Sequence, residues 1–144
     1  MLPMLSEFAD QADHLDMNVQ QQLANEDNEF AALTVRTEKT NYATYRDGAR
    51  DLLHKLRTFL AKHDYDQSEI QHITPPLISG TTALLEALGM MANQLRTINN
   101  DQRNWLPSIL TLRDNLRDAQ QGFAKNIKDA RSAIANERNL LGTL

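Results

Sequence analysis

The amino-acid sequence predicts an all-α protein, an elongated antiparallel bundle of about four long amphipathic helices with coiled-coil-like packing. Glycine and proline are scarce, with five and four residues among 144, and aromatic residues make up only 6%. An all-β domain of this size needs more turn-forming, β-branched and aromatic residues. Apolar residues also recur at alternating steps of three and four along four segments, which is the spacing of one buried face on a helix.

The first helix is expected at about residues 4–33. Pro3 suits a helix start, because its missing N–H falls among the amides that have no partner in the first turn. Glu26 is the single polar residue in the apolar seam. The seam consists of Leu5, Phe8, Ala12, Leu15, Val19, Leu23, Phe30 and Leu33. Residues 34–41 are rich in β-branched residues and poor in core-forming ones, so a connection or distorted turn is preferred there over an uninterrupted polar helix.

The second helix is expected at about residues 41–63. Its apolar stripe consists of Tyr42, Tyr45, Ala49, Leu52, Leu56 and Phe59. Leu53 and Leu60 widen this stripe, and together with Leu140 they are expected to expose apolar surface that favours self-association. Gly48 costs the helix up to about 1 kcal/mol relative to alanine, which makes it a candidate for a close helix crossing.

The third helix is expected at about residues 75–98, because Thr74-Pro75-Pro76 has the pattern of an N-cap followed by proline at the first helical position. Residues 65–73 are expected to form a loop with room for a short helical turn. The apolar stripe consists of Leu77, Thr81, Leu84, Leu88, Met91, Leu95 and Ile98. The small side chains of Ser79-Gly80-Thr81-Thr82 are expected to let a neighbouring backbone approach, since the phosphate-binding pattern of a preceding strand and Gly-Lys-Ser/Thr is missing.

The fourth helix is expected at about residues 101–141. Its apolar residues are Ile109, Leu112, Leu116, Ala119, Phe123, Ile127, Ala130, Ile134 and Leu141. Pro107 either begins this helix in its first turn or kinks it a turn and a half from the start. Single apolar stripes and short connections predict that the helices bury their stripes against antiparallel neighbours, within one domain over residues 1–144.

Composition also limits the chemistry and the cellular location to be expected of the protein. The absence of cysteine excludes disulfides, thiolate zinc sites and cysteine nucleophiles. No apolar run approaches the roughly 20 residues of a membrane span, and no basic stretch precedes an apolar one at the N-terminus, as it would in a signal peptide. These features predict a cytoplasmic protein without a membrane span.

Charge is distributed unevenly along the chain. Residues 1–33 contain seven acidic residues and no Lys or Arg, whereas the last helix carries seven basic residues against five acidic ones. We expect these charges either to pair within the bundle, where they would help choose which helices are neighbours, or to form a solvated face with local pairs such as Lys125 and Asp129. The alternative is a basic protein partner bound by Asp10, Asp13 and Asp16 of the first helix. Nucleic acid is not expected as a partner, because a chain with pI near 5.5 lacks a wide basic surface.

Motifs that carry chemistry are nearly absent. Glu69 and His72 have the Glu-x-x-His spacing that di-iron bundles use twice, with a further Glu from each of two other helices. None of His14, His54 and His63 has a Glu three residues upstream, and no Gly-x-Ser-x-Gly elbow is present. We therefore expect no catalytic residue, no metal site and no cofactor, in a protein that is not an enzyme.

The leading hypothesis is a protein that binds another protein, or a second copy of itself, through exposed helix faces. Such a bundle would act as a structural, chaperone-like or adaptor protein. Met90 and Met91 are candidate partner-binding residues, because adjacent methionines cannot both face one core stripe and the flexible thioether suits an adaptable surface. Trp105 is a third candidate, since a large ring near a helix end can anchor a partner.

The alternative hypothesis is a sensory bundle that holds a small molecule between its helices. The candidate residues are Tyr42 and Tyr45, one helical turn apart, and the small residues around Gly80. Both tyrosines also fit the core period, so packing within the core is the preferred interpretation of these two rings.

Overall fold

The computed structural model describes residues 2–31, 38–62, 68–96 and 106–142. These residues form four α-helices and no strand: α1 (Leu2–Ala31), α2 (Glu38–Lys62), α3 (Ser68–Arg96) and α4 (Leu106–Gly142). The prediction of an all-α helical bundle is therefore confirmed. With 37 residues, α4 is about 55 Å long at 1.5 Å per residue, which gives the bundle one long dimension.

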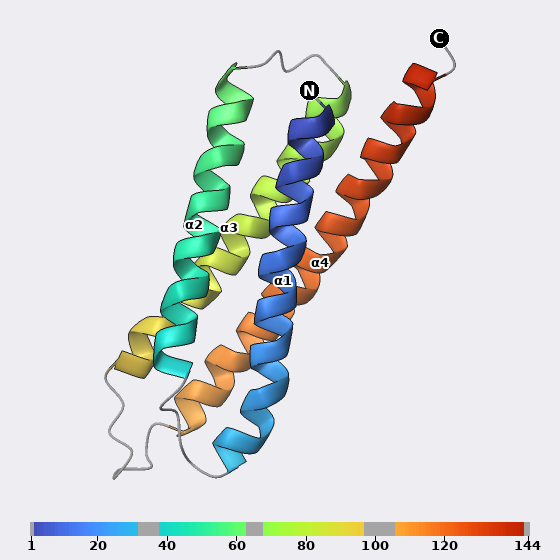
Figure 1. Cartoon of the computed structure of the whole chain (residues 1–144). Coiled ribbons are helices and arrows are strands. Elements are labelled where there is room, and N and C mark those ends of the chain that lie inside the picture. Colours follow the sequence, from blue (N-terminus) through green and yellow to red (C-terminus); the bar gives the residue numbers. More distant parts are fainter. Residues whose placement is uncertain (1, 32–37, 63–67, 97–105, 143–144) are drawn as a thin grey trace.

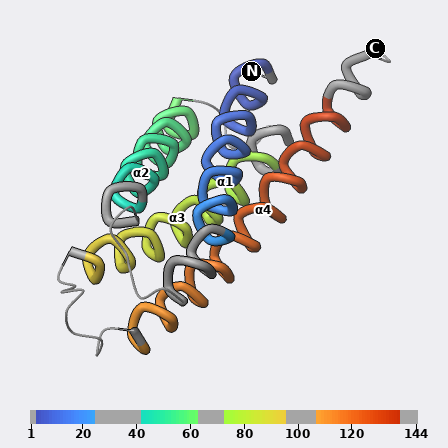
Figure 2. Tube along the Cα trace, turned by 60° about the horizontal axis from the view of Figure 1, so that its bottom comes forward, coloured from blue at the N-terminus to red at the C-terminus, as the bar shows by residue number. Residues whose placement is uncertain are grey.

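Successive helices run in opposite directions, and each packs against the next one along the chain (Figure 1). α1 also packs against α4, which closes the ring of helices, whereas the described parts of α2 and α4 are not in contact. The α3–α4 pair packs most extensively, and the α1–α2 pair packs least among the neighbouring pairs. In two different views the C-terminal end of α4 diverges from the helices beside it (Figure 1, Figure 2).

The core is built from the predicted apolar stripes. Every stripe residue whose side-chain environment is described is buried or half-buried, because the steps of three and four keep these residues on one side of each helix. The largest fully buried side chains come from all four helices, and they include Leu5, Tyr42, Leu88, Met91 and Phe123.

The start of the third helix differs from the prediction. α3 begins at Ser68 rather than at residue 75, so the expected loop at 65–73 is helical from residue 68 onward. Pro75 and Pro76 lie inside the helix and remove two backbone N–H donors. Ile73 and Thr74 are nevertheless fully buried, which extends the packed face of α3 by one turn before the prolines. This burial stabilises helical residues that the local signals alone would place before the start of the helix.

The other helix ends lie closer to expectation. α4 begins at Leu106, which places Pro107 in the first turn, the first of the two alternatives. α2 begins at Glu38, so the last part of the expected connection at 34–41 is helical, and residues 32–37 lie outside the described part.

The expectation that Leu53 is exposed beside the seam is wrong, because it is 5% exposed and belongs to the core. Leu60 is half-buried against the core, and the side chain of Leu140 is not among those that the structure describes.

Gly80 is the glycine that permits a close helix crossing. A Cβ atom at this position would lie 2.7 Å from Asn126 Nδ2 and 3.2 Å from Phe123 Cδ1, both on α4. The expected close approach is thus present at Gly80, but the approaching atoms belong to side chains of α4 rather than to its backbone. A Cβ atom at Gly48 would meet only Leu15 Cδ1 at an ordinary 3.7 Å, so Gly48 does not mark a tight crossing.

Candidate functional site

The candidate partner-binding residues predicted from the sequence are not gathered in one place. Met90 is 56% exposed, whereas Met91 is fully buried in the core, as expected for two adjacent positions that point about 100° apart on a helix. Met91 is thus a packing residue in this fold, and Met90 alone contributes to the surface. Trp105 lies outside the described residues.

Two of the acidic candidates on α1 pair with a basic residue of α4. Arg131 donates from Nε to Asp13 Oδ2 at 2.6 Å and from Nη2 to Asp10 Oδ1 at 2.7 Å, and its Nη2 also contacts Asp13. The hydrogen bonds that Arg131 donates, first to Asp10 and then to Asp13, raise its pKa. The expected pairing of opposite charges between the first and last helices is therefore present.

The third acidic candidate is buried. Asp16 is 6% exposed and accepts hydrogen bonds from Gln120 Nε2 on α4 at 2.8 Å and from Gln20 Nε2 on α1 at 2.7 Å. A buried carboxylate requires such donors, because an unpaired one would carry a large desolvation cost. All three carboxylates thus serve the α1–α4 contact, which leaves Asp16 inaccessible to a partner.

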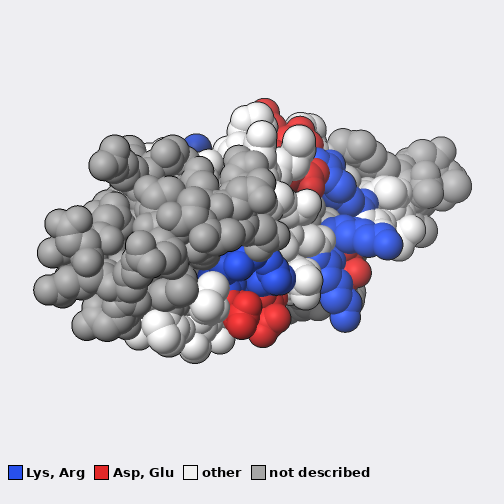
Figure 3. All heavy atoms as spheres, turned by 90° about the horizontal axis from the view of Figure 1, so that it is seen from below, with Lys and Arg blue, Asp and Glu red and all other residues white. Residues whose placement is uncertain are grey.

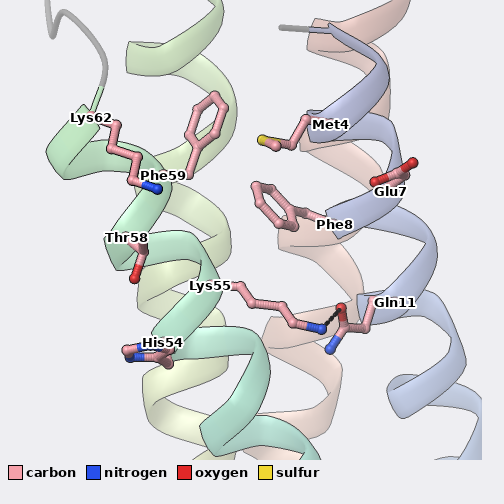
Figure 4. Close-up of a pocket in the computed structure, with 9 residues that line it drawn as sticks. All are labelled: Met4, Glu7, Phe8, Gln11, His54, Lys55, Thr58, Phe59 and Lys62. Carbon is pink, nitrogen blue, oxygen red and sulfur yellow. Dashed lines mark hydrogen bonds between the residues drawn. The ribbon is translucent and has the colours of Figure 1, made fainter.

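A surface hollow with a mainly apolar lining lies between α1 and α2 (Figure 4). We call it the α1–α2 groove, and its volume is about 470 Å³. It is lined by Met4, Glu7, Phe8 and Gln11 of α1 and by His54, Lys55, Thr58, Phe59 and Lys62 of α2. Because α1 and α2 run antiparallel, the first turns of α1 lie beside the last turns of α2 (Figure 1).

The floor of the α1–α2 groove is an aromatic pair. The rings of Phe8 and Phe59 meet edge to face, with centroids 5.5 Å apart and planes 82° apart, an arrangement favoured by the ring quadrupoles. Both rings are almost fully buried, and they hold the two helices together at this level. Met4, one turn before Phe8, is 48% exposed and points into the groove from α1 (Figure 4).

A polar bridge closes one end of the α1–α2 groove. Lys55 Nζ lies 3.0 Å from Asp51 Oδ2 and 3.4 Å from Gln11 Oε1, and Gln11 Nε2 donates to Asp51 at 3.1 Å. The Lys55 side chain therefore reaches from α2 across to α1 (Figure 4). The hydrogen bond from Lys55 is the main cause of a lowered pKa at Asp51, because it stabilises the charged carboxylate.

A second, shallower hollow of about 510 Å³ lies between α2 and α3. Its walls include Arg46 and Arg50 of α2 and Leu85, Gly89 and Met90 of α3. Both guanidinium groups lie near Asp47 Oδ1, at 3.5 and 3.7 Å. The exposed Met90 and the half-buried Leu85 both line this hollow.

The residues of the sensory hypothesis do not form one site. Tyr42 is fully buried and Tyr45 is half-buried, and burial raises the pKa of Tyr45. A Cβ atom at Gly89 would lie 3.9 Å from Arg46 Cδ, so the part of α2 near Tyr42 faces the C-terminal half of α3. Gly80 lies nine residues earlier on α3, about 14 Å along the axis, and packs against α4 instead.

Within the described ranges, no group of three or more His, Cys, Asp or Glu side chains is placed to hold a metal ion. The side chains of Glu69 and His72 are not among those that the structure describes. None of the described helices is long and apolar enough to span a bilayer. On the face of the described residues shown in Figure 3, basic and acidic side chains lie beside one another rather than in one broad basic surface.

Comparison with models of known protein families, with curated proteins and with solved structures finds no match. The α1–α2 groove itself was not predicted from the sequence. Two signals for it are present: Met4 stands one turn before Phe8 yet outside the seam, and Phe8 and Phe59 occupy opposite ends of adjacent antiparallel helices. Neither signal indicates by itself that the two helices part enough to leave a hollow.

Proposed function

We propose that this protein is a non-enzymatic binding protein that receives an amphipathic helix of a partner protein in the α1–α2 groove. One observation carries the proposal: an open hollow of about 470 Å³ with an apolar floor lies between the two neighbouring helices that pack least. A helix lying along two others can place its apolar stripe in such a hollow. This function includes the chaperone-like and adaptor roles expected for a helical bundle.

The chemistry of the α1–α2 groove supports helix docking. Phe8 and Phe59 provide a rigid apolar floor, and the exposed thioether of Met4 can adapt to different apolar side chains. Polar groups of Gln11, Lys55 and Thr58 surround this floor, as in protein interfaces with an apolar centre and a polar rim. A cytoplasmic location belongs to the same proposal, and the lack of cysteine in all 144 residues favours it.

A selected peptide can test the proposal without knowledge of the natural partner. A display library of 18-residue helices, with a fixed apolar stripe and varied flanking positions, is selected on the full chain. Binding is then located with ¹³C-methyl-labelled methionine, because Met4, Met17 and Met90 are exposed at different places on the surface. We expect selected peptides to shift the Met4 methyl signal and to leave Met17 and Met90 unchanged.

Two matched variants distinguish binding in the groove from non-specific binding. Met4 and Met17 are both exposed methionines on α1, but only Met4 lines the α1–α2 groove. Met4→Glu is expected to weaken peptide binding about tenfold or more, since it places a charge on an apolar contact, whereas Met17→Glu is expected to change it less than about twofold. A library that yields no binder, or binders that shift Met90 and not Met4, would contradict the proposal.

A further inference from the structure

We propose that the helix bound in the α1–α2 groove carries acidic residues along the edge that lies against α2. This inference rests on the proposed function and specifies the chemistry of the partner. It follows from the unequal charges of the two walls of the groove.

The α2 wall carries basic residues, and no acidic residue among those described lines it. Residues 52–62 of α2 contain His54, Lys55, Arg57 and Lys62, and no acidic residue. Three of these four side chains line the α1–α2 groove, and Arg57 is exposed on the neighbouring face. An acidic edge on the partner would find opposite charge along this wall, which favours encounter and fixes the register of docking.

Lys62 is the cation that is available to a partner. Lys55 is already engaged by Asp51 and Gln11 at one end of the groove. Lys62 lies one turn beyond Phe59, is exposed, and forms no ion pair with another described residue. In Figure 4 its ammonium group lies next to the Phe59 end of the groove, so a carboxylate beside the apolar stripe of a docked helix can reach it.

The α1 wall disfavours the reverse arrangement. Glu7 is the charged residue of α1 that lines the groove, and it is exposed. If the acidic edge of the partner faced α1, it would lie near the negative charge of Glu7. This repulsion disfavours the reverse arrangement and so contributes to specificity. A helix with a single acidic edge is therefore expected to dock in the one direction that turns this edge toward Lys62.

Three synthetic helices test the inference. They share one apolar stripe, taken from a peptide that shifts Met4, and carry Glu, Gln or Lys along one edge. We expect the Glu peptide to bind about two- to fivefold more tightly than the Gln peptide at low salt, and the Lys peptide to bind most weakly. The difference is expected to disappear near 0.5 M NaCl, because exposed charges are then screened.

Charge reversal on the protein completes the test. Lys62→Glu is expected to reverse the order, so that the Lys peptide binds more tightly than the Glu peptide. Lys128→Glu is the matched control: it makes the same charge change at an exposed position on α4, which does not contact α2, and should leave the order unchanged.

The outcomes distinguish the two proposals. If all three peptides shift Met4 with equal affinity, or if the preference for Glu survives in Lys62→Glu, the inference is overturned and the proposed function stands. If none of them shifts Met4, the proposed function fails. If the Met4 signal changes with protein concentration in the absence of peptide, and light scattering gives the mass of a dimer, a second copy covers the groove and the acidic partner is overturned.

Discussion

At the scale of single residues, the structure distinguishes two glycines that both lie inside helices. Gly80 and Gly122 both lie inside helices, where glycine is disfavoured by about 1 kcal/mol relative to alanine. Gly80 faces Asn126 and Phe123 of α4 at close range, whereas nothing lies within 4 Å of a Cβ atom at Gly122. The cost of glycine is thus compensated by helix packing at Gly80, and Gly122 has no such compensation among the described residues.

We therefore expect Gly80→Ala to be less stable than Gly122→Ala by about 1–3 kcal/mol in free energy of unfolding. Both substitutions gain the same helix propensity, but only the methyl group at residue 80 must displace the Phe123 ring and the Asn126 amide. Urea unfolding followed by circular dichroism measures the difference. Equal stabilisation of both variants would show that α3 and α4 do not cross as closely as the structure has them.

At the scale of elements, charge contributes to the pairing of α1 with α4. The pairing rests on the Arg131 hydrogen bonds to Asp10 and Asp13 and on the buried link between Asp16 and Gln120. The Arg131 ion pairs are partly exposed, so solvent weakens them. The hydrogen bond between Asp16 and Gln120 is buried, so loss of either partner would leave the other without a hydrogen bond. Together these contacts hold the acidic helix α1 against α4.

Arg131→Ala is expected to lower the free energy of unfolding by about 0.5–1 kcal/mol at low salt, because two carboxylates lose their partner. The loss should shrink at 0.5 M NaCl. Lys128→Ala, three residues earlier and also exposed, is the control and should change stability by less than about 0.5 kcal/mol. A salt-independent loss at Arg131 would indicate that its aliphatic stem, and not its charge, contributes to the packing of α1.

At the scale of the whole molecule, packing is uneven around the ring of helices. α3 and α4 form the most extensive contact, reinforced by the close approach at Gly80, and α1 and α2 part to leave the α1–α2 groove. Regions with fewer buried contacts open at lower free-energy cost than the core of the same domain. The proposed binding site therefore lies in the part of the bundle that can adjust to a partner at the lowest cost.

Native-state hydrogen exchange should show this difference directly. The slowest amides are expected in the middle of α3 and α4, around Leu84 and Phe123, which are fully buried. Amides of the first turns of α1, near Met4 and Phe8, should exchange faster, and a bound helical peptide should slow them selectively. Uniform protection across all four helices would contradict the unequal packing.

The sequence by itself determined the helical class, the number of helices and most buried apolar positions, because a step of three or four places a residue on one face of a helix wherever that helix lies. It also predicted the contact between α1 and α4 through opposite charges. The start of α3 was beyond local signals, since Pro75 and Pro76 suggest a boundary and only burial of Ile73 against other helices outweighs them.

Only the tertiary structure decided which exposed residues form a site. Periodicity marks Phe8 and Phe59 as core residues, yet it contains no information about how far α1 and α2 stand apart, since this distance depends on how the other two helices hold them. For the same reason the sequence allowed Tyr42 and Gly80 to line one pocket, whereas in the structure they lie at different heights along the bundle and face different helices. The spacing of residues along a helix is a local property, whereas a groove is formed by the relative placement of several helices.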